Sequence, residues 1–378
     1  MRRLLGALWM LAVVAACSEV AQEGPVAPQR TGLRLLGGEA GDGFARATEP
    51  RAFVFPADHG PHPEYRTEWW YFTGNLATTS GRHFGFELTF FRYALGPADA
   101  ARAGASAWRA EQVWMAHFAV TDTEGGRFIA RERLTREALG LAGAETDPLR
   151  VWVKEWAAAG QGVGDELTLR LDARDDAIAL GLDLTSTVGH VAHGNRGLDT
   201  KGAGAGNASH YYSVPRLAAN GRLTVEGETF TVEGLAWLDR EWSTSSLDPG
   251  TGGWDWFALH LSDGSSLMFY RLRTQSGEAS PYSSGSLLRA DGARIPLAAS
   301  DVELTVLEHW TSGTSGVRYP VAWRLEAPAA GLTLDVQPYL ENQELDLSVR
   351  YWEGAVRAAG QGPGGALTGQ GYLELAGY

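Results

Sequence analysis

The stretch Phe84-Gly85-Phe86-Glu87-Leu88-Thr89-Phe90 alternates large apolar residues with other residue types. In an extended strand its four large apolar side chains share one face, while Glu87 and Thr89 lie on the other. A half-buried β-strand has this period of two, whereas an amphipathic helix repeats its apolar residues every three or four positions. The stretch therefore predicts a β-strand packed on an apolar core.

The same alternation recurs on both sides of this strand, along most of the chain. Residue pairs typical of tight hairpin turns lie between or within alternating runs, at Asp175-Asp176, Glu226-Gly227, Asp263-Gly264 and Asp291-Gly292. The alternating runs are 114–120, 167–171, 178–184, 223–232, 257–269 and 332–336.

Short antiparallel strands joined by tight turns predict an all-β chain built from barrels or sandwiches. Only residues 97–109 and 131–141 are candidates for helices. The 378 residues exceed the roughly 250 that one hydrophobic core usually serves, which indicates two domains. The alternating runs form two series that divide near Pro215, and this predicts domains over residues 36–218 and 219–378.

The N-terminus has the pattern of a targeting segment. A short basic region precedes the apolar run Leu4–Ala16, which is too short for a transmembrane helix and ends at Cys17. It resembles a bacterial lipoprotein signal more than a secretory signal that happens to contain a cysteine, because Cys17 is the one cysteine of the chain. We predict a signal peptide over 1–16, lipidation of Cys17 and a flexible tether over 17–35. The protein would then be anchored in the bacterial cell envelope, facing the periplasm.

The composition narrows the classes of function. A formal charge of −13 argues against general nucleic-acid binding, because phosphate binding needs a positive surface. A single cysteine excludes a disulfide framework and an iron–sulfur cluster. The 14 tryptophans and 48 glycines favour strands, turns and an aromatic-lined interior.

Cofactor and metal motifs are weak in this sequence. No Walker loop, H-E-x-x-H helix, dinucleotide fingerprint or G-x-S-x-G elbow is present. His59, His62 and Glu64, and the pair His190 and His193, have the residue types of metal ligands, but loop spacing alone is weak evidence. We therefore predict neither a metal nor another cofactor.

The segment His62–Phe72 leads from a polar loop into a strand with four consecutive aromatic residues. Its alternation places Glu68, Trp70 and Phe72 on one face, where they are candidates to line a ligand site. An acid within an aromatic wall has a raised pKa when it is buried. The alternative is that Glu68 pairs with an arginine such as Arg66 or Arg92.

A second segment combines acids and tryptophans at unusual density. On an extended strand over Trp237–Ser243, one face holds Trp237, Asp239 and Glu241, and the other holds Arg240 and Trp242. Another tryptophan-rich run, which contains Trp254, follows shortly after it.

These residues allow two interpretations. In the first, Asp239 is a carboxylic acid held in an aromatic pocket beside His210, where it stays protonated near neutral pH and acts as a general acid. In the second, Arg240 forms a buried ion pair with a carboxylate and the tryptophans are core.

Four segments carry a resemblance to a known family: His62–Gly74, Phe84–Arg92, Trp237–Ser243 and Gly371–Tyr378. They look like the lipocalin-like family of carotenoid 1,2-hydratases and AttH-type proteins, over roughly residues 53–378. The resemblance implies two lipocalin-like (calycin) antiparallel β-barrel domains. Relatives include hydroxyneurosporene synthases, fungal pericyclases and proteins encoded near ABC-transporter genes.

The resemblance also implies a catalytic set. The hydratase is thought to protonate a terminal isoprenoid double bond with an Asp that has a Tyr two residues before it, helped by a His that has a Trp two residues after it. Asp239 matches the Asp and His210 the His, whereas Trp237 stands in the place of the Tyr and Tyr212 in that of the Trp. The exchanged aromatic residues keep an aromatic box and leave room for a change of substrate.

Two functions follow as expectations. The first is acid-catalysed hydration or isomerisation of an apolar, isoprenoid-like substrate, with Asp239, His210, Tyr212 and Trp237 as catalytic residues. The second is a non-catalytic carrier of a lipid or other apolar ligand that works with an ABC transporter. Convergence of Asp239 and His210 on a cavity favours the enzyme. The predicted ligand-binding residues are Glu68, Trp70, Phe72, Arg240, Glu241, Trp242 and Trp254.

Overall fold

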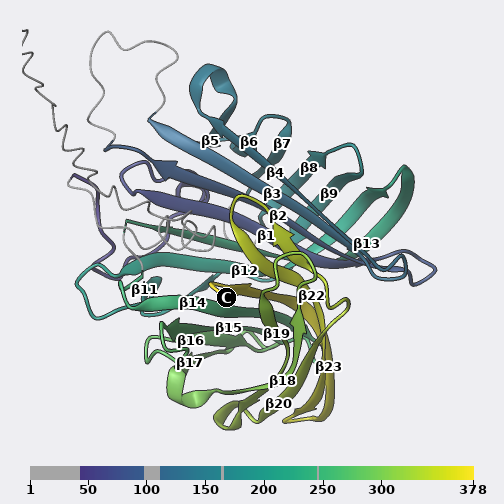
Figure 1. The fold of residues 1–378 in the computed structure, drawn as a ribbon. Coiled ribbons are helices and arrows are strands. Elements are labelled where there is room, and N and C mark those ends of the chain that lie inside the picture. The colour runs from purple at the N-terminus through teal and green to yellow at the C-terminus, as the bar shows by residue number, and fades with distance from the viewer. Residues whose placement is uncertain (1–42, 98–110, 163–165, 245–246) are drawn as a thin grey trace, which may run out of the picture.

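The computed structural model describes residues 43–97, 111–162, 166–244 and 247–378. Apart from short 3-10 turns, its regular elements are strands, which form two curved antiparallel sheets (Figure 1). One sheet is a nearly closed barrel and the other a half-barrel, so the predicted all-β, lipocalin-like fold is confirmed. No helix of the described segments has both the length and the apolar character needed to cross a membrane.

The first sheet contains strands β1 to β13. Their bounds are β1 (Thr67–Ala77), β2 (His83–Ala94), β3 (Gln112–Asp122), β4 (Arg127–Arg136), β5 (Ala142–Thr146), β6 (Leu149–Val153), β7 (Trp156–Gln161), β8 (Thr168–Arg174), β9 (Ile178–Ser186), β10 (Val191–Ala192), β11 (Leu198–Thr200), β12 (Ala208–Val225) and β13 (Glu228–Ser243). The order is β4-β3-β2-β1-β13-β12-β9-β8-β7-β6-β5, and β10 and β11 also pair with β12.

The second sheet contains strands β14 to β23. Their bounds are β14 (Thr251–Leu261), β15 (Ser266–Thr274), β16 (Ser284–Leu288), β17 (Arg294–Ala298), β18 (Glu303–Thr311), β19 (Arg318–Ala327), β20 (Leu332–Pro338), β21 (Glu344–Asp346), β22 (Arg350–Gly362) and β23 (Gly365–Ala376). The order is β17-β16-β15-β14-β23-β22-β20-β19-β18, with β21 paired to β22. The 3-10 turns are η1 (Ala57–His59), η3 (Ala138–Gly140), η5 (Ala299–Asp301) and η6 (Pro328–Ala330).

The predicted domain boundary at residue 218 does not coincide with the division between the two sheets. Strand β13 pairs with β1 along the register from Thr67–Ser243 to Ala77–Glu233, so β12 and β13 both belong to the first sheet. The second sheet begins only with β14. Alternation of apolar residues predicts a strand, but it does not predict which other strand pairs with it. The pairing of β1 with β13 joins residues far apart in sequence.

Two other predictions concern the ends of elements and the N-terminus. Residues 131–136 are part of β4 and are followed by the turn η3, so the helix considered over 131–141 is wrong. Most of the other helical candidate, 97–109, lies outside the described residues, as do the predicted signal peptide (1–16), the tether (17–35) and Cys17.

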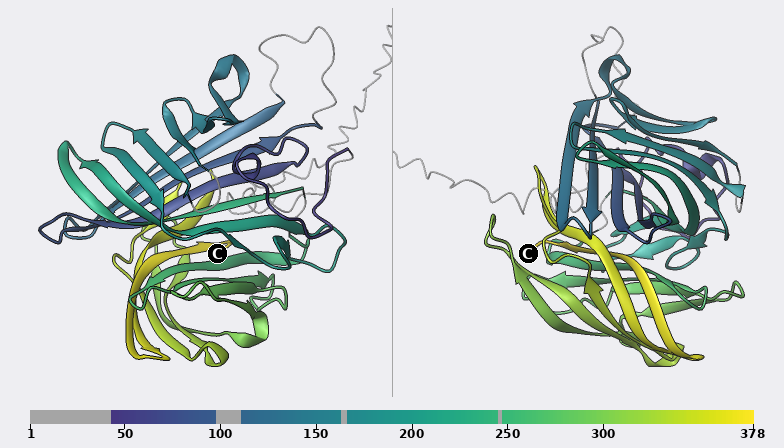
Figure 2. Two further views of the ribbon diagram at one scale, coloured as in Figure 1. Left: turned by 180° about the vertical axis from the view of Figure 1, so that it is seen from behind. Right: turned by 90° about the vertical axis from the view of Figure 1, so that its right-hand side faces the viewer.

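The two sheets pack face to face, as Figure 2 shows from two sides. Each has its own apolar core, and a third cluster, which includes Tyr71, Tyr211 and Trp256, lies between them. Phe84, Phe86, Leu88 and Phe90 face the core of the first sheet, as predicted. Glu87, on the opposite face of β2, is also fully buried, because β2 lies against β22 of the second sheet.

Candidate active site between the two sheets

A cavity lies between the two sheets, with walls from both of them. Its lining combines aromatic side chains with four acids and one cation. The first sheet and its loops contribute Asp239, Glu241 and Lys201, and the second sheet contributes Glu353 and Glu374. The cavity therefore holds several ionisable groups within a wall that is otherwise mainly aromatic and apolar.

The alternation of β13 decides which side chains reach this cavity. Asp239 and Glu241 share one face of β13, as predicted, and the structure directs this face at the second sheet. Trp237 lies in the cluster between the sheets. Asp239 is flanked by Tyr71 on β1 and by Ser213 on β12, its partners in register. Paired residues on neighbouring strands point to the same face, so these three side chains are neighbours.

Asp239 is the most completely hydrogen-bonded acid of the cavity. Its Oδ2 accepts a hydrogen bond from the Tyr211 hydroxyl (2.5 Å), and its Oδ1 accepts from Trp237 Nε1 (2.6 Å) and from the Ser213 hydroxyl. Burial raises the pKa of Asp239 and these three donors lower it, which leaves the pKa at about 7. Both protonation states are thus accessible near neutral pH.

The histidine that is linked to Asp239, through the Ser213 hydroxyl, is His193. Its Nε2 lies 2.6 Å from the Ser213 hydroxyl, and its Nδ1 lies 3.0 Å from the hydroxyl of Ser286 in the second sheet. Burial holds the pKa of His193 well below its usual range, so the ring is neutral. It accordingly donates from one nitrogen and accepts at the other. His193 therefore fixes the Ser213 hydroxyl that donates to Asp239.

The predicted pairing of His210 with Asp239 is wrong. His210 is opposite Trp242 in the register of β12 and β13, and Tyr212 is opposite Arg240, so both lie on the far face of the sheet. The ring of His210 packs 5.7 Å from that of Trp242, inside the first sheet. The faces of β12 follow from its pairing, and the cavity receives the neighbouring Tyr211 instead.

Glu68 belongs to a buried ion network inside the first sheet. Its two carboxylate oxygens lie 2.5 Å from Arg92 Nε and 3.1 Å from Arg240 Nη2, which confirms both the predicted alternative for Glu68 and the predicted ion pair of Arg240. Although burial alone would raise its pKa, the arginine charges hold the pKa of Glu68 well below its usual range. Trp70, Phe72 and Trp242 are core residues on the same face.

An apolar cavity adjoins the acidic one. It is the larger, at about 270 Å³ against about 100 Å³, and its lining includes Leu95, Val113, Met115, Leu134 and Val349. Five residues border both cavities: Trp69, Phe91, Trp254, Tyr351 and Glu374. Glu68 also borders the apolar cavity, with its carboxylate bound by arginines.

The second sheet supplies the facing acids. Glu353 accepts a hydrogen bond from the Tyr71 hydroxyl, and Glu374 accepts one from Trp254 Nε1 at 3.0 Å. Burial, aided by the charge of Glu87, raises the pKa of Glu374 to about 8 and that of Glu353 well above its usual range. Among the residues that the structure describes, no group of three His, Cys, Asp or Glu side chains is arranged to hold a metal ion.

Sequence reasoning missed most of this second wall, and it also missed Tyr211, Ser213, His193 and Lys201. Tyr211 and Ser213 adjoin Tyr212 in the sequence, and strand alternation places them on the face opposite His210 and Tyr212. That alternation was the available signal, but it does not predict which face meets the second sheet.

Removing the Ser213 hydroxyl is expected to raise the pKa of Asp239. A hydrogen bond to a charged acceptor is worth about 1.5–3 kcal/mol, which corresponds to a rise of about one to two pKa units in Ser213→Ala. Carbon-13 NMR of labelled aspartate carboxyls measures it. Ser348→Ala, at a hydroxyl that donates to Glu132 away from Asp239, should leave the titration unchanged. An unchanged or lower pKa in Ser213→Ala would contradict the assigned role.

Comparison with known proteins finds relatives that match most of the chain. The family model described as AttH-like matches residues 46–378, which is most of the chain. A crystal structure of a Nitrosomonas europaea protein described as AttH has a TM-score of 0.78 and 33% identity, and the match covers 89% of this chain and 100% of that one.

Two further relatives carry functional names. The crystal structure of kievitone hydratase from Nectria haematococca has a TM-score of 0.67 at 18% identity, covering 88% of this chain and 98% of that one, which is a likeness of fold. Dehydratase asqC of Emericella nidulans is 26% identical over 238 residues, 58% of this chain and 66% of that protein's length. By the extent of the family match and by its similarity to the Nitrosomonas europaea structure, the chain belongs to the AttH-like family.

Proposed function

We propose that this protein is a hydro-lyase, which adds water to a carbon–carbon double bond of an apolar substrate or removes it, in the cavity between the two sheets. The observation that carries the proposal is Asp239, a buried acid with three hydrogen-bond donors and a pKa of about 7 beside an apolar chamber. Relatives named as a dehydratase and a hydratase support a reaction of this type.

The chemistry needs one proton donor that can take the proton back. Protonated Asp239 gives its proton to one carbon of the double bond, and a carbocation forms at the other. Water adds to the cation, and the Asp239 carboxylate accepts the proton that the water loses. Tyr211, Ser213 and Trp237 stabilise the carboxylate between these steps, since each donates to it.

The aromatic lining would also stabilise the carbocation. Trp254 and Trp256 line the cavity, and a cation within reach of the π-face of such a ring is stabilised by about 0.5–2 kcal/mol. Dehydration is the same sequence in reverse. The isoprenoid class of the substrate remains part of this proposal.

Labelled water tests the reaction directly. The protein is incubated with an apolar lipid extract of its host in water enriched in oxygen-18, and the extract is analysed by mass spectrometry. A product that gains the mass of one labelled water, and forms only with active protein, would support hydration. Absence of any labelled or dehydrated product would count against the proposal.

A carrier of apolar ligands is the second candidate. The larger size of the apolar cavity favours it, together with the exposed Leu95 and Leu134 along its lining. Such a carrier would pass its ligand to a partner such as an ABC transporter. Recovery of one bound lipid, unchanged and in equal amount from the parent protein and from Asp239→Asn, would favour the carrier over the enzyme.

We further propose that the protein is anchored through Cys17 in the bacterial envelope, with its body facing the periplasm. The support is the basic and apolar sequence that precedes this cysteine. In bacterial cells fed labelled palmitate, the parent protein is expected to carry the label and to sediment with membranes. Cys17→Ser should lose both properties, and label retained by that variant would contradict the anchor.

A further inference from the structure

The cavity between the sheets contains more acid than base. Of its four acids, only Glu241 contacts the single cation of the lining, Lys201. Within the described segments no ion pair joins Asp239, Glu353 or Glu374 to a lysine, an arginine or a histidine. Buried carboxyls are normally paired with a cation or protonated, so a bound cation could replace the protons that these three acids otherwise hold.

Glu353 and Glu374 are the least compensated of these acids. They are partners in the register of β22 and β23, which places their side chains next to one another on one face. Glu353 is 1% exposed, and its Oε2 has no hydrogen-bond partner. Glu87 of the first sheet adds a third carboxyl nearby, and its Oε2 is also unpartnered. If both carboxyls were ionised without a cation, the like charges would repel each other, so a cation placed between them would favour their ionised forms.

The rings around these acids suit a cation with an apolar substituent. Trp69, Phe91, Trp254 and Tyr351 border both cavities, as Glu374 does, so the junction is an acid set among aromatic side chains. Aromatic cages of this kind bind quaternary ammonium groups. From the junction the apolar cavity continues past Val113 and Met115.

We propose that the junction of the two cavities binds an organic cation with an apolar chain, with the cationic group between Glu353 and Glu374 and the chain in the apolar cavity. This inference concerns the same cavity as the proposed reaction and rests on that cavity being the ligand site, but it requires no turnover. A stable cation held there would mimic the carbocation of the proposed hydration.

Binding of decyltrimethylammonium to the full-length protein tests the proposal, with 1-decanol and decanoate as probes of equal chain length. Quenching of tryptophan fluorescence reports occupancy, because Trp69 and Trp254 line the junction. Calorimetry in two buffers of different ionisation enthalpy reports protons released. The cation is expected to bind at least about ten-fold tighter than decanol, a difference of about 1.4 kcal/mol. It should release protons as the glutamates ionise, whereas decanol should release none.

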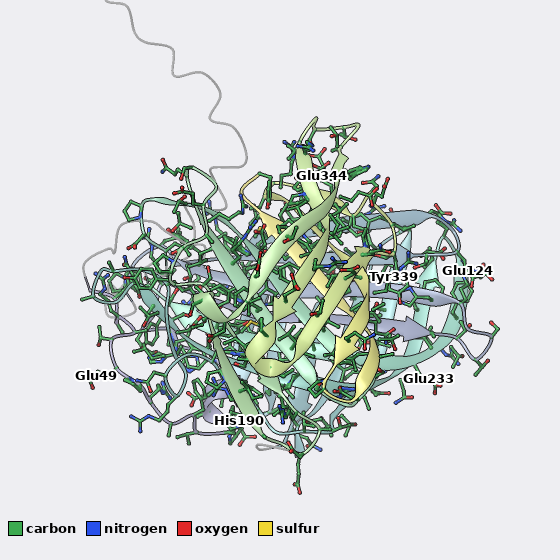
Figure 3. The ribbon with its side chains drawn as sticks, turned by 90° about the horizontal axis from the view of Figure 1, so that it is seen from below. Glu49, Glu124, His190, Glu233, Tyr339 and Glu344 are labelled. Atoms are coloured by element: carbon green, nitrogen blue, oxygen red, sulfur yellow. The ribbon has the colours of Figure 1, made fainter. Side chains whose placement is uncertain are left out.

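Two single variants locate the site. Glu353→Gln and Glu374→Gln should each lose most of the preference for the cation and keep the affinity for decanol, which also shows that they are folded. Glu233→Gln, at an exposed glutamate on the surface (Figure 3), should keep the preference. Equal binding of cation and alcohol by the parent protein, or a preference that survives both cavity variants, would overturn the proposal.

The outcomes separate this inference from the proposed function. Preference for the cation without labelled-water chemistry would retain the binding site and remove the enzyme. Hydration without a preference for the cation would retain the enzyme and remove the cation site.

Discussion

Asp239→Asn is expected to slow the labelled-water reaction by about 100- to 10,000-fold, the usual contribution of a positioned general acid. Asparagine keeps the size of the side chain and an oxygen that can accept from Tyr211 or Trp237, but it has no acidic proton to give to a double bond. The loss should therefore appear in kcat more than in KM. The rate of oxygen-18 incorporation under saturating substrate measures it.

A matched control separates chemistry from folding. Asp172→Asn changes an exposed aspartate that pairs with Arg170 on the surface of the first sheet, and it should leave the rate unchanged. Full activity in Asp239→Asn, with Asp172→Asn also active, would remove Asp239 as the acid.

The same variant makes an independent prediction about stability. The pKa of Asp239 rises from its unfolded value of 3.8 to about 7 on folding. A raised pKa gives stability that is fully present below 3.8 and is lost as the pH rises through about 7. At about 1.4 kcal/mol per pKa unit, the ionised acid destabilises the fold by up to about 4 kcal/mol. Relative to the parent, Asp239→Asn should therefore gain free energy of unfolding as the pH is raised from about 4 to about 8.

Urea denaturation at a series of pH values, followed by tryptophan fluorescence, measures this difference. A difference between parent and variant that does not change with pH would show that Asp239 is ionised with an ordinary pKa. That result would weaken its role as an acid even if the variant were inactive.

Glu68→Gln is expected to lower the free energy of unfolding by about 3–5 kcal/mol. The carboxylate of Glu68 compensates the buried guanidinium groups of Arg92 and Arg240, and a neutral amide would leave both charges without it. The lowered pKa of Glu68 sets the pH dependence: its contribution is present above the unfolded pKa of 4.5 and is lost as the pH falls. The gap between parent and variant should therefore be largest near neutral pH.

The control for this prediction is an ion pair that remains in water. Asp175 pairs with Arg131 at the surface, where both side chains are about one-third exposed, and Asp175→Asn should cost far less than Glu68→Gln. Chemical denaturation at neutral pH compares the two variants. If both lost the same amount of stability, the buried network would not be what holds the first sheet together.

The sequence by itself determined the strands and the faces within each strand. A period of two is a local property of the backbone, so the alternation of Phe84–Phe90 predicted a core-facing strand, and that of Trp237–Ser243 separated Asp239 and Glu241 from Arg240. The turn pair Asp263-Gly264 also predicted the hairpin of β14 and β15. The same local pattern offered Glu68 an arginine partner, and the structure supplies two.

Only the tertiary structure decided what each face meets. The pairing of β12 with β13 brings Tyr211 and Ser213 to Asp239 and turns His210 to the other side, because a shift of one residue in register exchanges the two faces of a strand. The packing of the second sheet onto the first buries the polar face of β2 and sets Glu353 and Glu374 opposite Asp239 across one cavity. The packing of the sheets brings β2 against β22 and places Asp239 in one cavity with Glu353 and Glu374. In both cases the residues are more than 100 positions apart, and such long-range packing leaves no periodic trace in the local sequence.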